Sequence, residues 1–561
     1  MDKPWLKSYP PGVPAEIDVH EFESVKDILE RSCQRFANLP AYSNLGVTIT
    51  YAELDRLTQH FAAFLQSLPG LRKGERVALM MPNLLQYPVA LFGVLRAGMV
   101  VVNVNPLYTA RELEYQLKDS GARSVVVVEN FARTLQQVVD KTEVEHVVTT
   151  QIGDMCPIPQ RWVVNFMVKY VKKMVPEWRI DGAIDFSVAL RRGVGARLED
   201  VPLTHDDVAF LQYTGGTTGV PKGAQLTHGN IIANLQQAST WIASTLKEGG
   251  ETIIAALPLY HIFCLTANLL TFMKYGGHNV LITNPRDLPA FVKELEKWRF
   301  TAITGVNTLF NALMNTPGFD KLDFSALKLA LGGGAAVQRA VAERWKQITG
   351  RPLIEAYGLT ETSPAACINP LTLEQFNGSI GLPIPSTDVT IRDDDDQEVP
   401  QGQVGEICVR GPQVMKGYWN MPDETAKTLT PDGWLKTGDM GYMDENGFVF
   451  ITDRKKDMIL VSGFNVYPNE IEGVLAMHPG ITESAAVGVH DDKSGEAVKV
   501  VVVRKDPNLT SEQVIAFCRE RLAAYKVPKH VEFRTELKKS PIGKVLRREL
   551  RDPAPAEVKA A

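Results

Sequence analysis

Short apolar runs alternate with longer mixed segments in the first part of the chain. Residues 76–81, 100–104 and 124–128 are mostly apolar runs of strand length, and such runs are typical of strands buried on both faces. The segments 84–97 and 111–119 lie between them and predict helices. Apolar strands that alternate with helices favour a parallel sheet with helices on both faces. We expect the same pattern again around 253–257, 280–282, 302–303 and 327–331.

The pattern changes at about residue 378. Residues 388–391 and 405–410 are short apolar runs that flank an acidic turn at 393–396. Glycines and prolines interrupt this region, which predicts short antiparallel strands. We therefore expect an α/β fold whose large N-terminal domain has mostly parallel sheets flanked by helices and, in addition, a small β subdomain.

The segment Arg454–Asp457 is the best candidate for a boundary between domains. Beyond it the chain predicts a helix over 469–477 and strands over 485–489 and 498–503, and Thr510 begins a capping-box pattern with Gln513. This mixture predicts a small α+β C-terminal domain. The two predicted domains are residues 1–454 and residues 455–561.

Composition narrows the class of protein. The chain has 561 residues, which is too many for one core, and it is 45% hydrophobic and 22% charged, as in ordinary globular proteins. A net charge of −5 gives no reason to expect nucleic acid as a partner. Six scattered cysteines without a Cys-x-x-Cys pair argue against zinc and against a disulfide framework, so we expect a cytoplasmic protein with reduced thiols.

Nothing in the sequence predicts a signal peptide or a membrane span. The N-terminus lacks the apolar core of a signal peptide. The most apolar long stretch, residues 88–104, is interrupted by Arg96 and Gly98.

Residues 213–224 read Tyr-Thr-Gly-Gly-Thr-Thr-Gly-Val-Pro-Lys-Gly-Ala and follow a predicted strand at 208–211. Glycine lets backbone N–H groups approach an anion, threonine adds hydroxyl donors, and Lys222 adds a positive charge. The stretch could be an ordinary turn, but this chemistry suits a polyphosphate. It is not a Walker A loop or a Gly-x-Gly-x-x-Gly motif, because Lys222 follows Pro221 and precedes Gly223.

The complete string resembles the AMP-binding signature of the adenylate-forming enzymes, which include the acyl-CoA synthetases, firefly luciferase and the adenylation domains of peptide synthetases. Six further segments match that superfamily in its order. Taken alone, each segment has a simpler structural explanation. It could contain a histidine of the core, form a turn, carry solvated acids of a loop, or belong to a basic surface that Lys544 shares with Arg547 and Arg548. Seven matching segments, in the order of the superfamily and spread over more than half of the chain, argue strongly against coincidence. The six segments are Pro258–His261, Gly332–Ala336, Tyr357–Glu361, Thr437–Asp439, Asp453–Lys456 with Ser462–Asn465, and Pro541–Lys544.

The match becomes narrower within the superfamily. Residues 432–441 and 451–456 resemble the signature of the fatty acyl-CoA synthetases, and with residues 76–87 they are similar to the bacterial long-chain fatty acid–CoA ligases. One departure is Leu460, where some relatives carry a lysine, so we assign no nucleotide contact there. The resemblance implies the substrates fatty acid, ATP and CoA, a Mg²⁺ ion, a place in fatty acid metabolism at the entry to β-oxidation, and a C-terminal domain that rotates about a hinge.

The resemblance also assigns roles to single residues. Lys544 would bridge the attacking carboxylate and the α-phosphate, and Thr360 would donate to that phosphate. Glu361 would bind Mg²⁺, and His261 would form a wall of the carboxylate pocket. Contacts to nucleotide, hinge or CoA are implied for Tyr213, Thr214, Gly215, Gly216, Thr217, Thr218, Gly219, Lys222, Gly333, Gly334, Ala335, Tyr357, Asp439, Arg454, Lys456 and Gly463.

Three other functions compete with a long-chain ligase. A medium-chain, aryl or carrier-protein acyl ligase of the same fold would differ only in the acyl tunnel, which the sequence does not describe. A non-catalytic lipid-binding protein is disfavoured because Lys222, Glu361, Asp439, Arg454 and Lys544 are all present. A P-loop NTPase fails on the glycine-rich loop itself.

The segment 162–175 predicts an amphipathic helix. Trp162, Phe166 and Tyr170 recur every four residues and would form an apolar face, and Lys169 and Lys172 supply positive charge. The helix could pack on the large domain or lie on an anionic leaflet. Because long-chain acids partition into bilayers, we expect a peripheral association with the inner face of the cytoplasmic membrane. A homodimer is compatible with the sequence.

Overall fold

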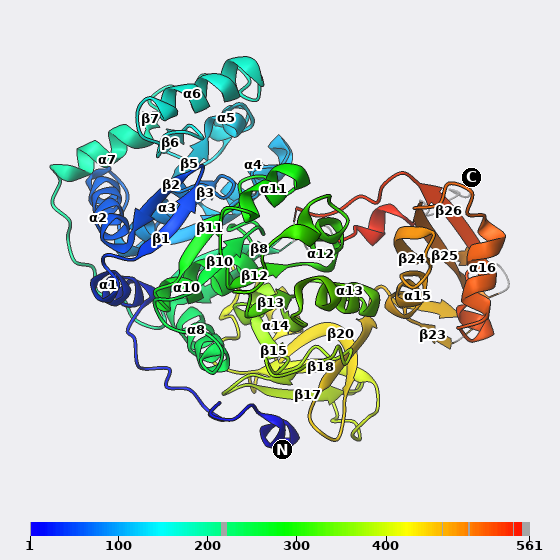
Figure 1. Cartoon of the computed structure of the whole chain (residues 1–561). Helices are drawn as coiled ribbons and strands as arrows, with labels where there is room; N and C mark the ends of the chain where they lie inside the picture. Colours follow the sequence, from blue (N-terminus) through cyan, green and yellow to red (C-terminus); the bar gives the residue numbers. More distant parts are fainter. Residues whose placement is uncertain (1, 215–220, 463, 492–493, 542, 552–561) are drawn as a thin grey trace, which may run out of the picture.

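The protein divides into a large body with three sheets and a small body at the C-terminus (Figure 1). The computed structural model describes residues 2–214, 221–462, 464–491, 494–541 and 543–551. The small body has its own apolar core, in which Ile459, Val500 and Cys518 are buried. A division after residue 454 remains a prediction.

The first sheet of the large body contains the strands that the apolar runs predicted. It is parallel from β7 to β8, and β9 and β19 extend it with antiparallel pairs. Its order is β19 (Gly417–Tyr418), β9 (Lys222–Thr227), β8 (Val208–Thr214), β4 (Val100–Asn103), β3 (Arg76–Met80), β5 (Ser124–Val128), β6 (His146–Thr150) and β7 (Ile184–Asp185).

The second sheet also has a parallel centre, from β1 to β14, with antiparallel strands at both edges. Its order is β16 (Leu382–Pro383), β15 (Ala365–Ile368), β14 (Leu353–Gly358), β13 (Leu329–Gly332), β12 (Ala302–Gly305), β10 (Thr252–Ala255), β11 (His278–Leu281), β1 (Pro40–Asn44) and β2 (Val47–Thr50). The mostly parallel α/β architecture expected from the sequence is confirmed.

Helices cover these two sheets, as the alternating pattern predicted. The segments 84–97 and 111–119 form α3 (Gln86–Arg96) and α4 (Ala110–Ser120). The other helices of this region are α1 (Val25–Arg35), α2 (Tyr51–Ser67), α5 (Glu129–Gln136), α7 (Phe186–Val194), α8 (His228–Ile242), α9 (Ile262–Cys264), α10 (Thr271–Lys274), α11 (Leu288–Leu295), α12 (Asn307–Met314), α13 (Arg339–Thr349) and α14 (Pro422–Thr428).

The two remaining sheets match the change of pattern after residue 378. The third is antiparallel, in the order β17 (Asp388–Arg392), β18 (Gly405–Arg410), β20 (Leu435–Met443) and β21 (Val449–Arg454). The fourth belongs to the small body and contains β23 (Phe464–Val466), β22 (Ile459–Val461), β25 (Gly495–Arg504), β24 (Ile481–Asp491) and β26 (His530–Arg534). Two helices pack there, α15 (Pro468–Leu475) and α16 (Ser511–Arg519), and the capping box of Thr510 and Gln513 is confirmed.

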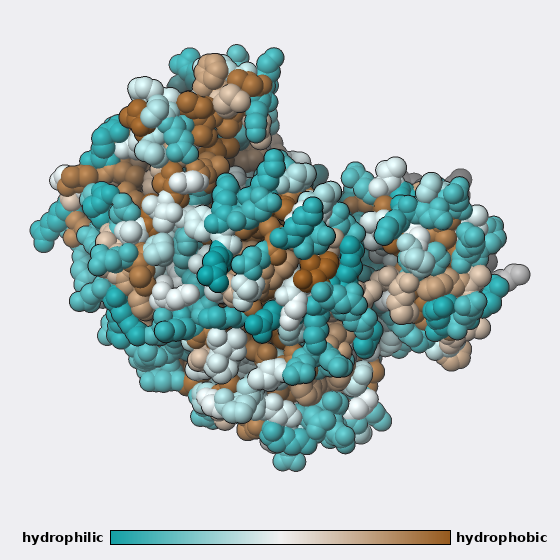
Figure 2. Space-filling view, in the orientation of Figure 1, coloured by the Kyte–Doolittle hydropathy of each residue, from teal (hydrophilic) through white to brown (hydrophobic). Residues whose placement is uncertain are grey.

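The predicted amphipathic segment is helical, but it does not pack through its apolar face. It forms α6 (Gln160–Phe166) and a π-helical continuation, Met167–Val171. Trp162, Phe166 and Tyr170 are 66%, 57% and 62% exposed. Figure 2 shows hydrophobic side chains gathered over α6. Of the two arrangements left open by the sequence, packing of this face on the large domain is therefore wrong. Within the described part of the chain, no helix combines the length and the apolarity that crossing a membrane requires.

Candidate active site

The parallel strands β8, β13 and β14 end at one large cavity. Thr214 ends β8, Gly333 follows β13, and Thr360 follows β14, and all three line a cavity of about 2180 Å³. Ligands of open α/β sheets bind at the carboxyl ends of the strands. The segments that the sequence singled out therefore lie where such a fold binds its ligand.

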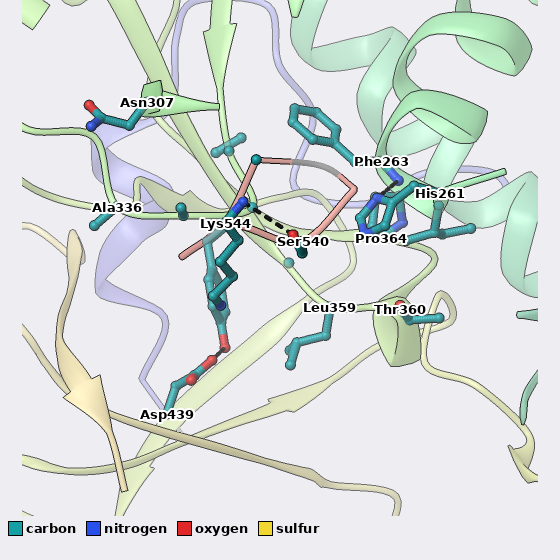
Figure 3. Close-up of a pocket in the computed structure, with 18 of the residues that line it drawn as sticks. His261, Phe263, Asn307, Ala336, Leu359, Thr360, Pro364, Asp439, Ser540 and Lys544 are labelled. Atoms are coloured by element: carbon teal, nitrogen blue, oxygen red, sulfur yellow. Dashed lines mark hydrogen bonds between the residues drawn. The ribbon is translucent and has the colours of Figure 1, made fainter. Parts of the chain in front are cut away.

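Lys544 enters this cavity from the small body. Figure 3 shows it among His261, Thr360 and Asp439 of the large body. A tight turn holds it, because its backbone N–H donates to Ser540 Oγ at 3.1 Å and its carbonyl accepts from Ser540 N–H at 2.7 Å. Burial, and then the charge of Arg454, lower the pKa of Lys544 to about 8. The ammonium is therefore held where a bound anion would stabilise its charge.

The turn of Lys544 is also attached to the large body. The hydroxyl of Thr308 on α12 donates to the carbonyl of Gly543 at 2.9 Å. Gly543 has φ +86°, a conformation that glycine adopts readily. A Cβ at this residue would stand 2.8 Å from the Thr308 hydroxyl, so both conformation and space favour glycine beside the lysine.

Asp439 lies on the opposite wall with two partners. The hydroxyl of Tyr357 donates to its Oδ2 at 2.7 Å, and Arg454 Nε lies 3.3 Å from its Oδ1. β20 and β21 place Asp439 directly opposite Arg454 in register. Burial and the carboxylate of Asp439 raise the pKa of Tyr357 well above its usual value, so the phenol stays protonated. The carboxylate is buried yet fixed, as a group that accepts hydrogen bonds from ligand hydroxyls should be.

Glu361 stands on a 3₁₀ turn, Thr360–Thr362, at the end of β14. The hydroxyl of Tyr418 donates to its Oε1 at 2.6 Å, and its carbonyl accepts from Met415 N–H at 2.8 Å. Both Thr360 and Glu361 line the cavity. The carboxylate is therefore oriented by a neutral donor and is not neutralised by a cation in an ion pair among the described residues.

Only part of the glycine-rich loop can be placed. Gly215, Gly216, Thr217, Thr218 and Gly219 lie outside the described residues. Thr214 and Lys222 are register partners at the ends of β8 and β9. Lys222 forms an ion pair with Glu424 of α14, and its Nζ stands 5.0 Å from the centre of the Tyr418 ring. Tyr213 donates from its hydroxyl to Asp119 at 2.5 Å, which anchors the strand that leads into the loop.

The segment after β13 comes close to β14 without bulky side chains between them. A Cβ on Gly333 would lie 3.0 Å from the Ala356 carbonyl, and Gly334 has φ +74°. Ala335 lines the cavity beside them. Glu355 of β14 also lines this wall and was not predicted; its Oε1 accepts from Val337 N–H at 3.0 Å. Burial raises the pKa of Glu355 to about 8, so this is a polar but weakly charged niche that could hold a flat heterocycle.

His261 caps α9 and lies at the edge of the cavity. Its Nδ1 accepts from Phe263 N–H at 3.3 Å. Burial, and then the charge of Lys544, lower the pKa of His261 to about 4. The imidazole is therefore neutral at pH 7 and acts as a wall and a hydrogen-bonding group, not as a second cation.

The cavity continues into an apolar chamber that the sequence did not reveal. Asn234, Ala238 and Ile242 line it at spacings of four residues along one face of α8, which spans about 12 Å. Ala267, on the π-helical segment Leu265–Leu270, and Phe272, on α10, also line the cavity. Such local widening of a helix is frequent at functional sites. The chamber could hold an extended apolar chain.

The predicted hinge lies next to this site. Lys456 lines the cavity, and burial followed by the charge of Arg454 lowers its pKa to about 8. The neighbouring Lys455 pairs with Asp394 at 2.7 Å and lies 3.5 Å from Glu406, both in the β subdomain. Gly463, predicted to line the path of CoA, lies outside the described residues.

Two family models match most of this chain. Residues 29–419 match the family described as AMP-binding enzyme, and residues 470–544 match the AMP-binding enzyme C-terminal domain. A long-chain-fatty-acid–CoA ligase of Escherichia coli O6:H1 is 58% identical over 558 residues, which is 100% of this chain and 99% of the relative. A protein of the same name from Bacillus subtilis is 40% identical over 98% of this chain and 97% of its own length.

Solved structures share the fold. The anthranilate CoA ligase AuaEII in complex with anthranoyl-AMP superposes with a TM-score of 0.84 at 26% identity, over 95% of this chain and 98% of that one. ATP-bound MatB from Rhodopseudomonas palustris gives a TM-score of 0.80 at 29% identity, over 94% and 98% of the two chains.

Proposed function

The chain belongs to the AMP-binding enzyme family, and from this premise we infer that it is a long-chain fatty acid–CoA ligase. It activates a fatty acid with ATP and transfers the acyl group to CoA. One observation carries the assignment of chemistry to this site: Lys544 of the small body lies in the same cavity as Thr360, Glu361 and Asp439, and that cavity continues into an apolar chamber.

The first half-reaction makes the acid reactive. A carboxylate is a poor electrophile at neutral pH because its leaving group would be oxide. Its oxygen attacks the α-phosphorus of ATP, the bond to the bridging oxygen breaks, and pyrophosphate leaves with that oxygen and its electron pair. An acyl-adenylate remains. Negative charge spreads over phosphate oxygens in the transition state, so fixed cations and donors stabilise it.

The residues of the cavity are suited to these tasks. Lys544 would lie between the attacking carboxylate and the α-phosphate, and Thr360 would donate its hydroxyl to that phosphate. Lys222 and the loop before it would hold the β- and γ-phosphates, which requires Lys222 to leave Glu424. Asp439 would accept hydrogen bonds from the ribose hydroxyls, since it already accepts one from Tyr357.

A Mg²⁺ ion fits beside Glu361. Mg²⁺ usually takes one or two carboxylates together with substrate phosphates, and Glu361 is a carboxylate that lines the cavity and is already oriented by the Tyr418 hydroxyl. When bound there, the ion would neutralise phosphate charge. Glu361 itself would hold that position, while Thr360, its neighbour on the same turn, would keep its hydroxyl directed at the α-phosphate.

In the second half-reaction the thiol of CoA attacks the acyl carbonyl, the thiol proton is lost to solvent, and AMP leaves. Lys544 and CoA need the same side of the acyl-adenylate in turn. We propose that the small domain, residues 455–561, rotates about Lys456 to remove Lys544 and to bring Gly463 to the path of CoA. In this proposal, the position of Lys544 inside the cavity is the one that would serve the first half-reaction.

The long-chain-fatty-acid–CoA ligases that are 58% and 40% identical to this chain support the long-chain assignment over the medium-chain, aryl and carrier-protein alternatives, and the apolar chamber agrees with an extended acyl chain as ligand. An assay of pyrophosphate release across saturated acids of increasing length tests it. We expect the highest kcat/KM with long chains. A maximum with aryl or short acids would contradict the substrate assignment, and no pyrophosphate release with any acid would contradict the ligase function.

We also propose a peripheral contact with an anionic membrane through α6 and its π-helical continuation. The apolar face of this helix is exposed, while two polar side chains on its other side, Arg161 and Asn165, bind the loop at residues 153–154. Arg161 pairs with Asp154 at 2.9 Å, and Asn165 accepts from Gly153 N–H at 2.8 Å. A helix that is fixed through its polar side and leaves its apolar side in water is suited to lie on a bilayer. The contact would place the enzyme where long-chain acids collect. Its acyl-CoA product would then supply fatty acid breakdown by β-oxidation.

A homodimer remains a prediction from the sequence, which sedimentation velocity of the purified chain would check.

A further inference from the structure

A cluster of ionic groups lies directly behind the turn that carries Lys544. Its centre is Arg547, whose Nη2 and Nε donate to the two carboxylate oxygens of Glu472 at 2.8 Å and 3.1 Å. Nη2 also donates to Asn469 Oδ1 at 2.6 Å. Glu472 and Asn469 both lie on α15, so these contacts are internal to the small body.

The same guanidinium reaches across to the large body. Its Nη1 donates to Asp453 Oδ1 at 3.2 Å. Asp453 lies on β21, its side chain is fully buried, and its Oδ2 accepts the backbone N–H of Asn469 at 2.8 Å. Asp453 is therefore attached to the small body at two points, by Arg547 and by the first turn of α15.

We propose that Arg547 is a positioning residue for Lys544, in that its bridge between Glu472 and Asp453 holds the small domain in the orientation that acid activation needs. The proposal rests on the ligase function inferred above. Arg547 comes three residues after Lys544, so the cluster fixes one end of the short segment whose other end Thr308 holds through Gly543. A guanidinium bound to two carboxylates fixes direction as well as distance, which a single surface ion pair does not.

The cluster is specific to one state of the enzyme. Asp453 precedes the proposed hinge at Lys456, whereas Asn469, Glu472 and Arg547 follow it. Rotation about the hinge moves the last three together and separates them from Asp453. The contacts between Arg547 and Glu472 survive that movement, but the two contacts to Asp453 do not. Arg547 thus serves adenylate formation and has no positioning task in thioester formation.

Separate assays of the two half-reactions test this. Adenylate formation is followed by pyrophosphate exchange, and thioester formation by supplying the acyl-adenylate and CoA. We expect Arg547→Met to lower the rate of the first about tenfold to a hundredfold, because a displacement of about 1 Å can have such an effect. The rate of the second should stay within about twofold of the wild type, and Arg547→Lys should recover part of the first.

Asp453→Asn provides a second variant that leaves Arg547 paired with Glu472. One carboxylate oxygen becomes an amide that must face either Arg547 or Asn469 N–H, both of which are donors, so one cross-domain contact is lost. Asp453→Asn should give the same selective loss. The double variant should be no worse than the poorer single variant, since both remove the same interaction. Arg534→Met, which removes an ion pair with Glu532 inside the small body, is the matched control and should leave both rates unchanged.

Equal losses in the two half-reactions, or no loss in Asp453→Asn, would overturn the positioning role. If Arg547→Met does not fold, Asp453→Asn decides alone. Failure of the ligase function itself looks different, because the wild type would then be inactive in both assays.

Discussion

At the level of single residues, the site depends on a lysine whose protonated form the surrounding protein destabilises. Burial and the neighbouring Arg454 lower the pKa of Lys544 to about 8, so the protein groups around this cation do not fully stabilise it. A ligand with negative phosphates would restore that stabilisation. Lys544 is thus prepared for the charge that develops during the first half-reaction, and this has two measurable consequences.

The first consequence is a division of labour. Lys544→Ala should lower the rate of acyl-adenylate formation by about 10²–10³, as removal of a fixed donor to a developing oxyanion does. Thioester formation from supplied acyl-adenylate should continue, because CoA occupies that side of the site in the second step. Rapid-quench assays of the two steps measure this. An equal decline in both would mean that Lys544 supports the structure of the site and has no special role in the first step.

The second consequence is a pH dependence. The useful form of Lys544 is protonated, and its pKa is depressed to about 8. The kcat/KM of adenylate formation, which reports the free enzyme, should therefore fall as the pH rises through about 8. The kcat should fall only at higher pH, because bound phosphates raise the pKa of the lysine. In Lys544→Arg, whose guanidinium stays charged, the residual activity should lack the fall near pH 8. If it keeps that fall, another group is responsible.

Sequence reasoning found the residues whose motifs are local and missed those defined by packing. Tyr357, Asp439 and Lys544 stand in short recognisable strings, and the structure brings them to one cavity. The Glu355 side chain lies in a strand like any other, and only the fold reveals its burial. The simpler alternative for Lys544 was a basic surface shared with Arg547, and the structure contradicts it for Arg547, since four of the hydrogen bonds of Arg547 go to Asp453, Asn469 and Glu472.

At the level of elements, periodicity predicted the strands and helices well but not the spaces between them. The apolar runs became β3, β4 and β5 because a strand buried on both faces needs apolar residues at most of its positions. The acyl chamber has no such signature. It arises where one face of α8 meets the π-helical segment Leu265–Leu270, and a meeting of two distant segments leaves no period in either.

The chamber yields a test of chain-length selection. Ala238 lies in the middle of the α8 face that lines the cavity. Replacing it by Val, Leu and Phe in turn should lower kcat/KM for long acids progressively, by about tenfold for Phe, while acids too short to reach it are affected little; one or two methylene groups in an apolar pocket change rates by about 10–200-fold. Pyrophosphate release across saturated acids measures the shift. A uniform decline at all lengths would show that α8 does not form the acyl wall.

At the level of the whole molecule, the proposed membrane contact must be compatible with the proposed rotation of the small domain. Figure 1 shows α6 at one end of the large body and the small body at a distance from it. A membrane that contacts α6 would therefore leave the small domain free to rotate. The apolar chamber lies in the same large body as α6.

This arrangement predicts that the membrane contact matters for delivery of the acid and not for chemistry. The apolar face of α6 would insert, and Lys172 would contribute about 1 kcal/mol near an anionic surface. Phe166→Ser/Lys172→Glu should sediment less with anionic vesicles, and high salt should weaken binding of the wild type. With a long-chain acid presented in those vesicles its rate should fall several-fold, whereas with a short, water-soluble acid it should equal the wild type. Val404→Ser/Lys321→Glu removes an exposed apolar side chain and a charge elsewhere on the large body and is the matched control. If the folded Phe166→Ser/Lys172→Glu variant binds vesicles as the wild type does, α6 is not the membrane contact. If it loses activity equally with both acids, the segment supports the site in another way.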